Sequence, residues 1–521
     1  MKSIIKLKTK YVNDVIGKEY KQWRSGDVVK IKTQTGSGKT YFIKNSLIPY
    51  IDELNALKIF NDFKVLILTN RINLSRQIKK DLLIKYKEKI PKKLEDIDKH
   101  KQINNVTIMS YQGLNEIISN DSDFNLNYYN YVICDEIQYL FDDSWNGRVY
   151  EVLNCLINQK CENTIKIFMS ATMEQLDNVI NKCDKNNLWE YDTDRDYSYL
   201  KPYTYNKIEQ LIREIINDKT KNKWIIFISN IEKGKELLKQ LQKNRINSVM
   251  IYRGCKHKKS KEELNNIIMN EKFNSKVLIT TKILDNGINI TDKDVKNIVV
   301  NSWNKINLIQ SIGRVRFKNI KEAYEINLYL DVKTRKQFSA KAQSIDKTLK
   351  HFELLIADKN EFNKKFRNKL NQLPNGIHLD KNNQFTFDKI TYANLLKSKL
   401  ELSKIKDDFS SELYINKQLG WLGLDKDIVD LNEIQQKQET DEIEEYIKSL
   451  IDKPLDKEQQ NELINTLNLK DYRNRLQRSY SAVNGYLQGE HNLYIETVRR
   501  KVNNKRITLW IIRNQEAIYL E

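Results

Sequence analysis

Residues 33–40 read Thr33-Gln34-Thr35-Gly36-Ser37-Gly38-Lys39-Thr40 and lie between a short alternating run, residues 28–32, and a helix-like run, residues 41–48. The expected order is strand, glycine-containing loop and helix. Such a loop binds a phosphate chain through backbone N–H groups at the start of the helix, because glycine allows the turn to be tight. Lys39 would neutralise the β- and γ-phosphates, and the hydroxyl of Thr40 would bind Mg²⁺. The stretch therefore predicts a nucleotide-binding loop.

The first position of this loop departs from the strict P-loop pattern, which begins with glycine and here has Thr33. Gly36 must supply the conformational freedom instead. The alternative is a solvated turn, but the chain has only 15 glycines in 521 residues, and two of them lie within three positions directly before Lys39. The residues expected to contact the nucleotide are Thr35, Gly36, Ser37, Gly38, Lys39 and Thr40.

Short apolar runs alternate with longer amphipathic ones on the C-terminal side of this loop. The apolar runs are residues 63–68, 105–110, 131–134 and 164–169. They are rich in β-branched residues, as buried parallel strands are, and predict an α/β domain over residues 1–200. A polar and aromatic segment, residues 192–202, interrupts the pattern.

The alternation resumes in a second series of apolar runs. They are residues 224–228, 248–252, 276–280, 295–300 and 324–330. This series predicts a second α/β domain over residues 201–335, without a P-loop of its own. Beyond it, long helix-like runs with few strand signals predict a mostly helical C-terminal accessory region over residues 336–521.

The composition favours a nucleic-acid partner and a reducing compartment. The net charge is +20, which attracts polyanions, although codon bias in an AT-rich genome is an alternative source of the lysines. The five cysteines are odd in number and include no Cys-x-x-Cys pair, which argues against a disulfide framework or a zinc module. No signal-peptide pattern and no run of 18 apolar residues is present, so we expect a cytoplasmic protein without a membrane span.

An acidic pair, Asp135-Glu136, follows the apolar strand 131–134. At the carboxyl end of a strand beside a P-loop, ATP hydrolysis needs one carboxylate for Mg²⁺ and another for the attacking water. We expect Asp135 to hold the metal and Glu136 to act as general base. An acidic turn after a strand is the alternative.

With these residues the chain resembles a superfamily 2 nucleic-acid helicase of the DEAD/DEAH-box-like kind, over roughly residues 15–335. The P-loop corresponds to motif I, residues 135–138 (Asp-Glu-Ile-Gln) to motif II, and residues 170–172 (Ser-Ala-Thr) to motif III. The resemblance implies two tandem RecA-like parallel-sheet domains with ATP and Mg²⁺ bound between them. It also implies that Ser170 and Thr172 couple the ATP site to the nucleic-acid face.

Further stretches resemble the motifs that contact nucleic acid. Residues 68–77 are similar to motif Ia, residues 107–114 to the Thr-x-x-x-Tyr-Gln stretch after it, and residues 280–290 to motif V. The resemblance implies that the nucleic-acid backbone is bound by Thr69, Asn70, Arg71, Ser110 and Thr281. It places Asp285 and Gly287 on the nucleotide side. Helix capping is the alternative role for Thr69, Asn70 and Ser110.

Residues 310–316, Gln310-Ser311-Ile312-Gly313-Arg314-Val315-Arg316, are similar to motif VI, which supplies arginine fingers across the cleft. The resemblance implies catalytic roles for Gln310 and the two arginines. The family's second arginine lies three residues after the first, a position that is Phe317 here. On a helix, Arg316 would be rotated by about 100° from that position, so Arg314 is favoured and Arg316 is the second candidate. The alternative is that both arginines cover a helix surface.

Two assignments are less specific. Gln22, upstream of the P-loop, is a candidate for reading the adenine edge. Basic and aromatic residues interleave over residues 472–510, which suits unpaired bases and phosphates. An ordinary helical bundle with an aromatic core and a solvated basic face explains them equally well, and a protein partner is a separate expectation for the C-terminal region.

Together these features predict an ATP-dependent helicase or translocase of phage, mobile-element or bacterial type. It would use ATP and Mg²⁺ and act on DNA rather than RNA. The alternative is a nucleic-acid-binding ATPase switch, or the motor subunit of a restriction, defence or replication complex, that does not separate strands.

Overall fold

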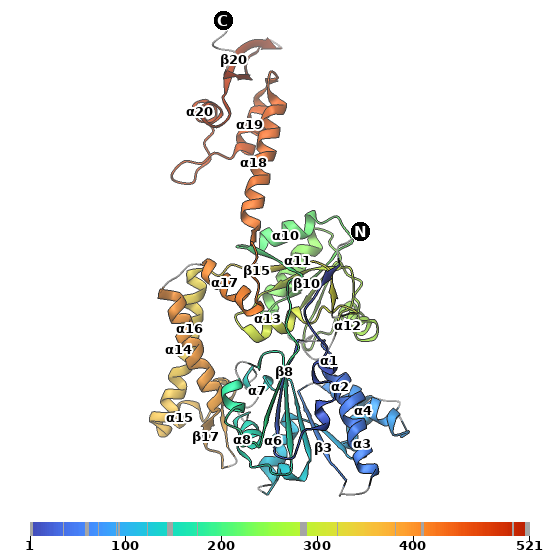
Figure 1. Ribbon diagram of the computed structural model, residues 1–521. Coiled ribbons are helices and arrows are strands. Elements are labelled where there is room, and N and C mark those ends of the chain that lie inside the picture. The colour runs from blue at the N-terminus through green and yellow to red at the C-terminus, as the bar shows by residue number, and fades with distance from the viewer. Residues whose placement is uncertain are drawn as a thin grey trace. The chain divides into compact units, whose positions relative to one another are not determined.

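The computed structural model describes most of the chain (Figure 1). The described residues are 4–34, 36–57, 62–70, 72–89, 91, 94–121, 123–142, 149–173, 176–281, 289–319, 321–380, 382–407, 411–502 and 505–515. The chain divides into two compact units, Met1–Val429 and Asp430–Glu521. Each unit is described separately.

The first sheet of unit 1 has seven strands in the order β4-β5-β3-β6-β7-β2-β8. Their bounds are β2 (Val28–Lys32), β3 (Val65–Thr69), β4 (Gln102–Ile103), β5 (Val106–Ser110), β6 (Tyr131–Asp135), β7 (Ile165–Ser170) and β8 (Leu188–Asp192). All neighbours pair in parallel except β4 and β5. The parallel order brings the carboxyl ends of β2, β3 and β6 to one edge, where the predicted nucleotide loop lies.

Helices cover both faces of this sheet (Figure 1). They are α3 (Ile48–Ala56) and α4 (Ile72–Lys85) on one side, and α6 (Tyr111–Asn120) and α8 (Val149–Asn158) on the other. Alternate residues of β3 point to opposite sides, so Val65 and Ile67 pack in one core and Leu66 and Leu68 in the other. Burial on both faces explains the nearly continuous apolar runs of the sequence.

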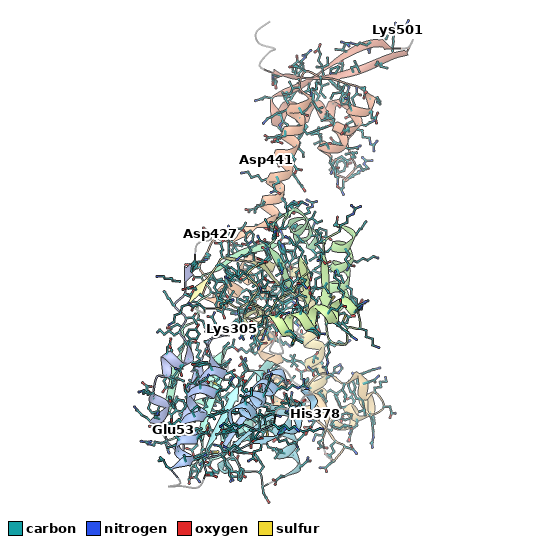
Figure 2. All side chains as sticks on the ribbon, turned by 90° about the vertical axis from the view of Figure 1, so that its right-hand side faces the viewer. Glu53, Lys305, His378, Asp427, Asp441 and Lys501 are labelled. Carbon is teal, nitrogen blue, oxygen red and sulfur yellow. The ribbon has the colours of Figure 1, made fainter. Side chains whose placement is uncertain are left out.

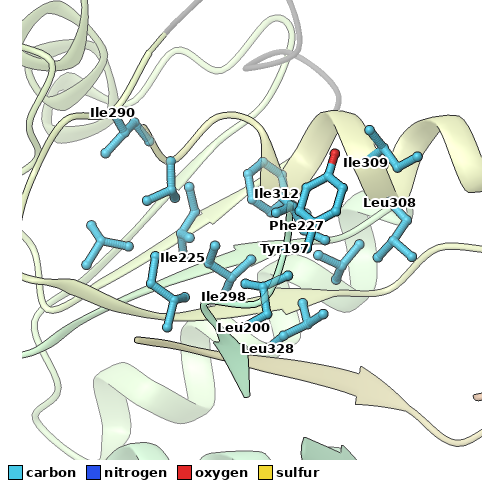
Figure 3. Packing of buried hydrophobic residues seen from close by; sticks show 14 of the residues in the cluster. Tyr197, Leu200, Ile225, Phe227, Ile290, Ile298, Leu308, Ile309, Ile312 and Leu328 are labelled. Carbon is cyan, nitrogen blue, oxygen red and sulfur yellow. The ribbon is translucent and has the colours of Figure 1, made fainter. Parts of the chain in front are cut away.

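The second sheet also has seven strands, in the order β11-β12-β10-β13-β15-β9-β18. Their bounds are β9 (Leu200–Tyr205), β10 (Lys223–Phe227), β11 (Ser248–Ile251), β12 (Val277–Thr280), β13 (Val295–Val300), β15 (Ile326–Asp331) and β18 (Val429–Asp430). The strands from β11 to β9 pair in parallel. Figure 3 shows Ile225, Ile298 and Leu328 from three of these strands in the same apolar cluster as Ile309 of α13 (Lys305–Ile312). The predicted pair of parallel α/β domains is therefore confirmed.

The N-terminal segment joins these two domains. β1 (Ile5–Lys6) pairs antiparallel with β14 (Glu322–Ala323), and Leu7 is buried in the core of the second domain. Farther along, the backbone N–H of Val12 donates to the carbonyl of Ser37 in the P-loop at 2.9 Å. Residues 5–7 lie within the range predicted for the first domain, but their contacts are with the second.

A helical part completes unit 1. It consists of α14 (Arg335–Ala357), α15 (Lys359–Phe366), α16 (Lys389–Asp407) and α17 (Ser411–Leu422), with the hairpin β16 (Ile377–Leu379) and β17 (Phe385–Phe387). It contacts both domains: the Asn394 amide donates to the Phe141 carbonyl at 2.7 Å, and the Gln418 amide donates to the Ser302 carbonyl at 3.2 Å.

Unit 2 contains three helices and a small antiparallel sheet with strand order β19-β21-β20. Its elements are α18 (Leu431–Leu450), β19 (Pro454–Leu455), α19 (Lys457–Leu467), α20 (Tyr480–His491), β20 (Leu493–Val502) and β21 (Lys505–Asn514). The mostly helical character of the C-terminal region is confirmed, but the prediction missed β20 and β21. Part of the signal was present, because the apolar Leu493 and Ile495 alternate with Tyr494 and Glu496 as in a half-buried strand.

None of the described helices is both long enough and apolar enough to cross a bilayer.

All five cysteines are free thiols. Burial raises the pKa of Cys134, Cys161 and Cys183, and raises that of Cys155 to about 11.

We expect only Cys255 to react rapidly with a thiol reagent such as DTNB at pH 8 in the native protein. A thiol reacts as its thiolate, and the raised pKa values keep the other four protonated. Three of these four, Cys134, Cys161 and Cys183, are also buried. Titration in native buffer should give one fast equivalent, and titration in guanidinium chloride should give five. Rapid release of several equivalents from the native protein would contradict these burial assignments.

Candidate nucleotide site and nucleic-acid interface

The P-loop turns at its two glycines. Gly36 has φ +92° and Gly38 has φ +88°, conformations that residues with a Cβ rarely adopt. The Ser37 hydroxyl donates to the Gln34 carbonyl at 2.7 Å and is also hydrogen-bonded to the Thr33 hydroxyl. The backbone N–H of Thr33 donates to the carbonyl of Ser170 at 2.9 Å. The backbone at the first position thus continues the pairing of β2 with β7, and the Thr33 hydroxyl adds a contact to Ser37 that glycine could not make.

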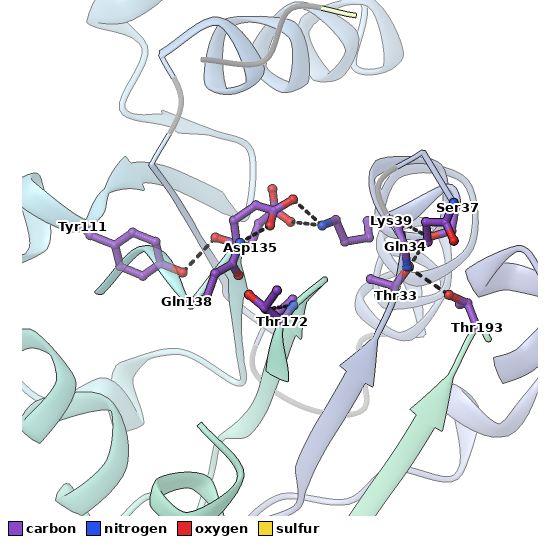
Figure 4. A network of polar contacts seen from close by, with 11 residues as sticks. Thr33, Gln34, Ser37, Lys39, Tyr111, Asp135, Gln138, Thr172 and Thr193 are labelled. Carbon is purple, nitrogen blue, oxygen red and sulfur yellow. Dashed lines mark hydrogen bonds and ion pairs between the residues drawn. The ribbon is translucent and has the colours of Figure 1, made fainter. Parts of the chain in front are cut away.

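Lys39 meets the acidic pair at the end of β6 (Figure 4). Its Nζ lies 2.5 Å from Oε1 of Glu136 and 3.7 Å from Oδ1 of Asp135. The Gln138 amide donates to the other Glu136 oxygen at 2.5 Å. Both carboxylates are at most 4% exposed. The structure therefore brings together the predicted phosphate ligand, metal ligand and general base.

These residues also fit a magnesium ion. The buried carboxylate of Asp135 and the hydroxyl of Thr40, at the first turn of α2 (Lys39–Phe42), are oxygen donors of the kind that Mg²⁺ prefers beside phosphates. No nitrogen or sulfur donor belongs to this set, so its chemistry suits a hard cation.

Sequence reasoning missed the role of Tyr111. Its fully buried hydroxyl donates to the backbone carbonyl of Asp135 at 2.9 Å and so fixes the turn that carries the acidic pair. Burial, reinforced by nearby acidic groups, raises the pKa of this phenol and keeps it a donor. On the other side of the turn, the Ser170 hydroxyl accepts from the Thr172 N–H at 2.9 Å. A tyrosine directly after a buried strand was the available signal.

The structure places the two arginines of residues 310–316 differently from the prediction. The expectation that they lie on a helix is wrong, because α13 ends at Ile312 and Gly313 follows it as the C-cap. The backbone N–H of Arg316 instead donates to the carbonyl of Ile290 at 2.8 Å. The rotation of about 100° that favoured Arg314 therefore does not apply.

Arg316 is the arginine that reaches the P-loop. A methyl group added at Gly36 would lie 3.7 Å from both Cδ and Nε of Arg316. Arg314 has no exposed surface and is one of the largest fully buried side chains in the described part of the chain. Gln310 lies on α13 and is partly exposed. Arg316 therefore lies beside the P-loop, and the choice between Arg314 and Arg316 as the arginine finger stays a prediction.

The expected nucleic-acid residues lie at strand ends of the first domain and, for Thr281, of the second. Thr69 ends β3 and is 1% exposed, and Asn70 follows it. Within the described residues, Oδ1 of Asn70 is buried without a hydrogen-bond partner. The Ser110 hydroxyl accepts from the Gly113 N–H at 3.0 Å, which is the helix-capping alternative. Thr281 follows β12 and is partly exposed.

The structure gives no evidence for the role of five predicted residues. Gln22 is exposed at the end of a short 3-10 helix, Glu19–Lys21, and its role in reading adenine stays a prediction. Four others lie outside the described residues: Thr35, Arg71, Asp285 and Gly287.

Two cavities lie between the sheets and the helical part of unit 1. The larger has a volume of about 490 Å³ and is bordered by Thr172, by Lys305 at the start of α13 and by Lys397 of α16. The second, of about 460 Å³, lies between α6 and β16, and the two share Asn375. Thr172, the last residue of the stretch similar to motif III, lies on the wall of the larger cavity.

The comparisons with known proteins agree with these motifs. Residues 16–179 match the DEAD/DEAH box helicase family, and residues 206–318 match the helicase conserved C-terminal domain. No curated relative matches the chain.

Similar solved structures include Dbp5 of S. cerevisiae bound to RNA and ADP BeF3, with 16% identity over 64% of this chain and 86% of that one, at a TM-score of 0.42. Mss116p bound to ssRNA and AMP-PNP has 15% identity over 66% of this chain and 79% of that one, at a TM-score of 0.42. A DEAD box protein from the hyperthermophile Methanococcus jannaschii has 18% identity over 64% and 89%, at 0.38.

Proposed function

We propose, for a chain that belongs to the superfamily 2 helicases, that ATP hydrolysis between its two parallel-sheet domains drives movement along a nucleic-acid strand or its unwinding. One observation carries the proposal: Arg316 of the second domain contacts the P-loop whose Lys39 already meets Asp135 and Glu136. Residues from both domains are needed to complete this site, so hydrolysis and domain closure are coupled.

The ion pair between Lys39 and Glu136 gives the order of events. A triphosphate carries more negative charge than one carboxylate, so Lys39 exchanges Glu136 for the β- and γ-phosphates when ATP binds. Glu136, released from the lysine, accepts the proton of the attacking water. Thr40 and Asp135 would hold Mg²⁺, which neutralises charge on the phosphates.

Arg316 then stabilises the charge that develops on the transferring phosphoryl group. Its position against Gly36 means that small domain movements bring the guanidinium to the phosphates or withdraw it. Nucleic acid bound across both domains therefore controls the rate.

The two neighbouring cavities, which share Asn375, are the proposed path of the strand. Lys305 and Lys397 border the larger cavity, and Thr172 places motif III on its wall. Such contacts bind the phosphate backbone without reading sequence. We take the strand to be DNA, with RNA as the alternative that the Dbp5 and Mss116p structures contain.

ATPase activity should be stimulated by a single strand, and strand binding should weaken steeply with salt. If about five phosphates are neutralised, affinity falls about 10²-fold between 50 and 200 mM salt. Fluorescence anisotropy with labelled single-stranded DNA and RNA measures this slope. Affinity that does not change with salt concentration would argue against binding through the phosphate backbone.

Strand-displacement assays on tailed duplexes separate the two candidate functions. Displacement supports a helicase, whereas stimulated ATPase without displacement supports an ATPase switch or motor subunit. Lack of any stimulation by DNA or RNA would overturn both.

A further inference from the structure

Unit 2 has the order of elements of a winged helix-turn-helix domain. Three helices, α18, α19 and α20, are followed by the hairpin β20–β21, and the short strand β19 between α18 and α19 pairs with β21. The connection between α19 and α20, residues 468–479, is longer than the usual turn of about three or four residues. We propose that this unit is a second nucleic-acid site, which binds duplex DNA with α20 in the major groove and the hairpin on the backbone.

This inference goes beyond the proposed ATPase, because the matched families end at residue 318 and unit 2 begins at Asp430. It does not depend on the chemistry of the nucleotide site. Evidence against the duplex-DNA site would therefore not count against the proposed ATPase, and the reverse also holds.

One face of α20 packs against the core of unit 2, and the opposite face is exposed to solvent. Val483 and Leu487 are buried in the core of the unit, and the Tyr480 hydroxyl donates to the carbonyl of Ile495 in β20 at 2.9 Å. The opposite face carries Ser481, Gly485, Gln488 and Gly489, all exposed. A Cβ added at either glycine would meet nothing within 4 Å. This face is narrow enough to enter a groove about 12 Å wide.

The end of the hairpin carries unpaired positive charge. Arg499, Arg500, Lys501 and Arg506 are exposed, and none of them has an acidic partner among the described residues. Lys501 lies directly opposite Arg506 in the strand register, where like charges repel. At the base of the same hairpin, by contrast, Arg513 is paired with Asp452 at 2.6 Å and Glu496 at 2.9 Å.

An anion is the partner that relieves this repulsion. Phosphates spaced along a duplex supply it, and arginine binds them with two parallel hydrogen bonds. Because the basic residue at the base of the hairpin is already paired and those at its end are not, the phosphates would contact the end.

Basic and acidic residues are also separated along unit 2, and the basic part includes the hairpin. Residues 470–513 contain ten Lys or Arg and three Asp or Glu, whereas residues 430–462 contain four Lys or Arg and eleven Asp or Glu. Figure 2 shows Lys501 at the free end of the hairpin and Asp441 on α18, well apart from it. A polyanion can approach the side of α20 and the hairpin, but the acidic side of α18 repels it.

The connection before α20 adds a further contact surface. Tyr472 is 87% exposed, and the guanidinium of Arg473 lies 5.0 Å from the centre of its ring. Arg478, two residues before the helix, is also exposed. These groups extend the basic surface toward the N-terminus of α20, where a DNA backbone would pass.

The shape of the surface selects DNA over RNA. B-form DNA has a major groove that admits an α-helix, while the major groove of A-form RNA is too deep and narrow for side chains to read. We therefore commit to duplex DNA, and duplex RNA becomes an outcome that would overturn the proposal.

The test uses the full chain without nucleotide and measures anisotropy of a labelled blunt DNA duplex. The triple variant Arg499→Ala, Arg500→Ala, Lys501→Ala should weaken binding at least about 10-fold at low salt and reduce the salt slope by about 2.7, at about 0.9 per phosphate contact. The matched control Lys437→Ala, Lys453→Ala, Lys457→Ala removes the same charge from the exposed acidic side of the unit and should leave the slope unchanged.

A second pair of variants tests the helix without endangering the fold. Replacing Gly485 by Glu or by Lys raises helix propensity in both cases and meets open space, so both proteins should fold. Gly485→Glu should lose duplex affinity by at least about 10-fold relative to Gly485→Lys, because only the glutamate repels phosphate.

Equal effects of the basic triple variant and its control, or equal binding by the two Gly485 variants, would overturn the proposal. So would duplex RNA bound as tightly as duplex DNA with the same dependence on Arg499 to Lys501. ATPase activity stimulated by single strands should persist in all these variants, which distinguishes loss of this site from failure of the proposed motor.

Discussion

Glu136→Gln should lower the rate of ATP hydrolysis by about 10² to 10⁴-fold without weakening ATP binding. Glu136 is 3% exposed and lies at the end of β6, where its carboxylate can take the proton of the attacking water. An amide of the same shape has no such basicity. The substitution also removes the carboxylate that holds Lys39 at 2.5 Å, so the lysine becomes available to phosphate and ATP affinity should increase.

Single-turnover hydrolysis and the binding of a fluorescent ATP analogue measure the two effects separately. Glu162→Gln is the control, because Glu162 lies in the same domain, is highly exposed and pairs only with Lys160 at 2.7 Å in the described part of the chain. Its turnover should match the wild type. Wild-type turnover in Glu136→Gln would remove Glu136 from the mechanism.

Arg316→Ala should lower the ATP hydrolysis rate by about 10³ to 10⁵-fold, the range found for arginine fingers, with little change in thermal stability. Its side chain is only partly buried and contacts the P-loop from the other domain. Arg316→Lys should recover part of the rate, since lysine keeps the charge but not the planar fork.

Arg314→Ala provides the contrast. Arg314 is fully buried, so truncation leaves a cavity, and the main effect should be a lower midpoint of thermal unfolding. Differential scanning calorimetry and steady-state kinetics on both variants measure the two effects. A well-folded Arg314→Ala without activity, beside an active Arg316→Ala, would assign the finger to Arg314 instead.

Features that depend on a few consecutive residues could be predicted from the sequence. The strand, glycine loop and helix around Lys39 are such a feature, since local backbone requirements dictate the residue types. The acidic pair at the end of β6 is another, because the carboxyl ends of parallel strands meet at one edge.

Features that depend on contacts between distant residues could not be predicted. The bond from Tyr111 to the Asp135 carbonyl spans 24 residues, and the pairing of Ile5 with Ala323 spans most of the ATPase region. Neither leaves a local pattern. The assumption that Arg314 and Arg316 lie on a helix failed for a different reason: the helix was assumed to continue past Gly313, but α13 ends at Ile312.

The pairing of β1 with β14 limits how the two domains can move. The chain between Asp192 and Leu200 is one attachment between them, and the N-terminal strand is a second. The helical part adds a third connection, because Asn394 contacts the first domain and Gln418 the second. Each connection removes directions in which the domains can separate, so the cleft should open along a restricted path, and each ATP cycle should return Arg316 to the P-loop along that path.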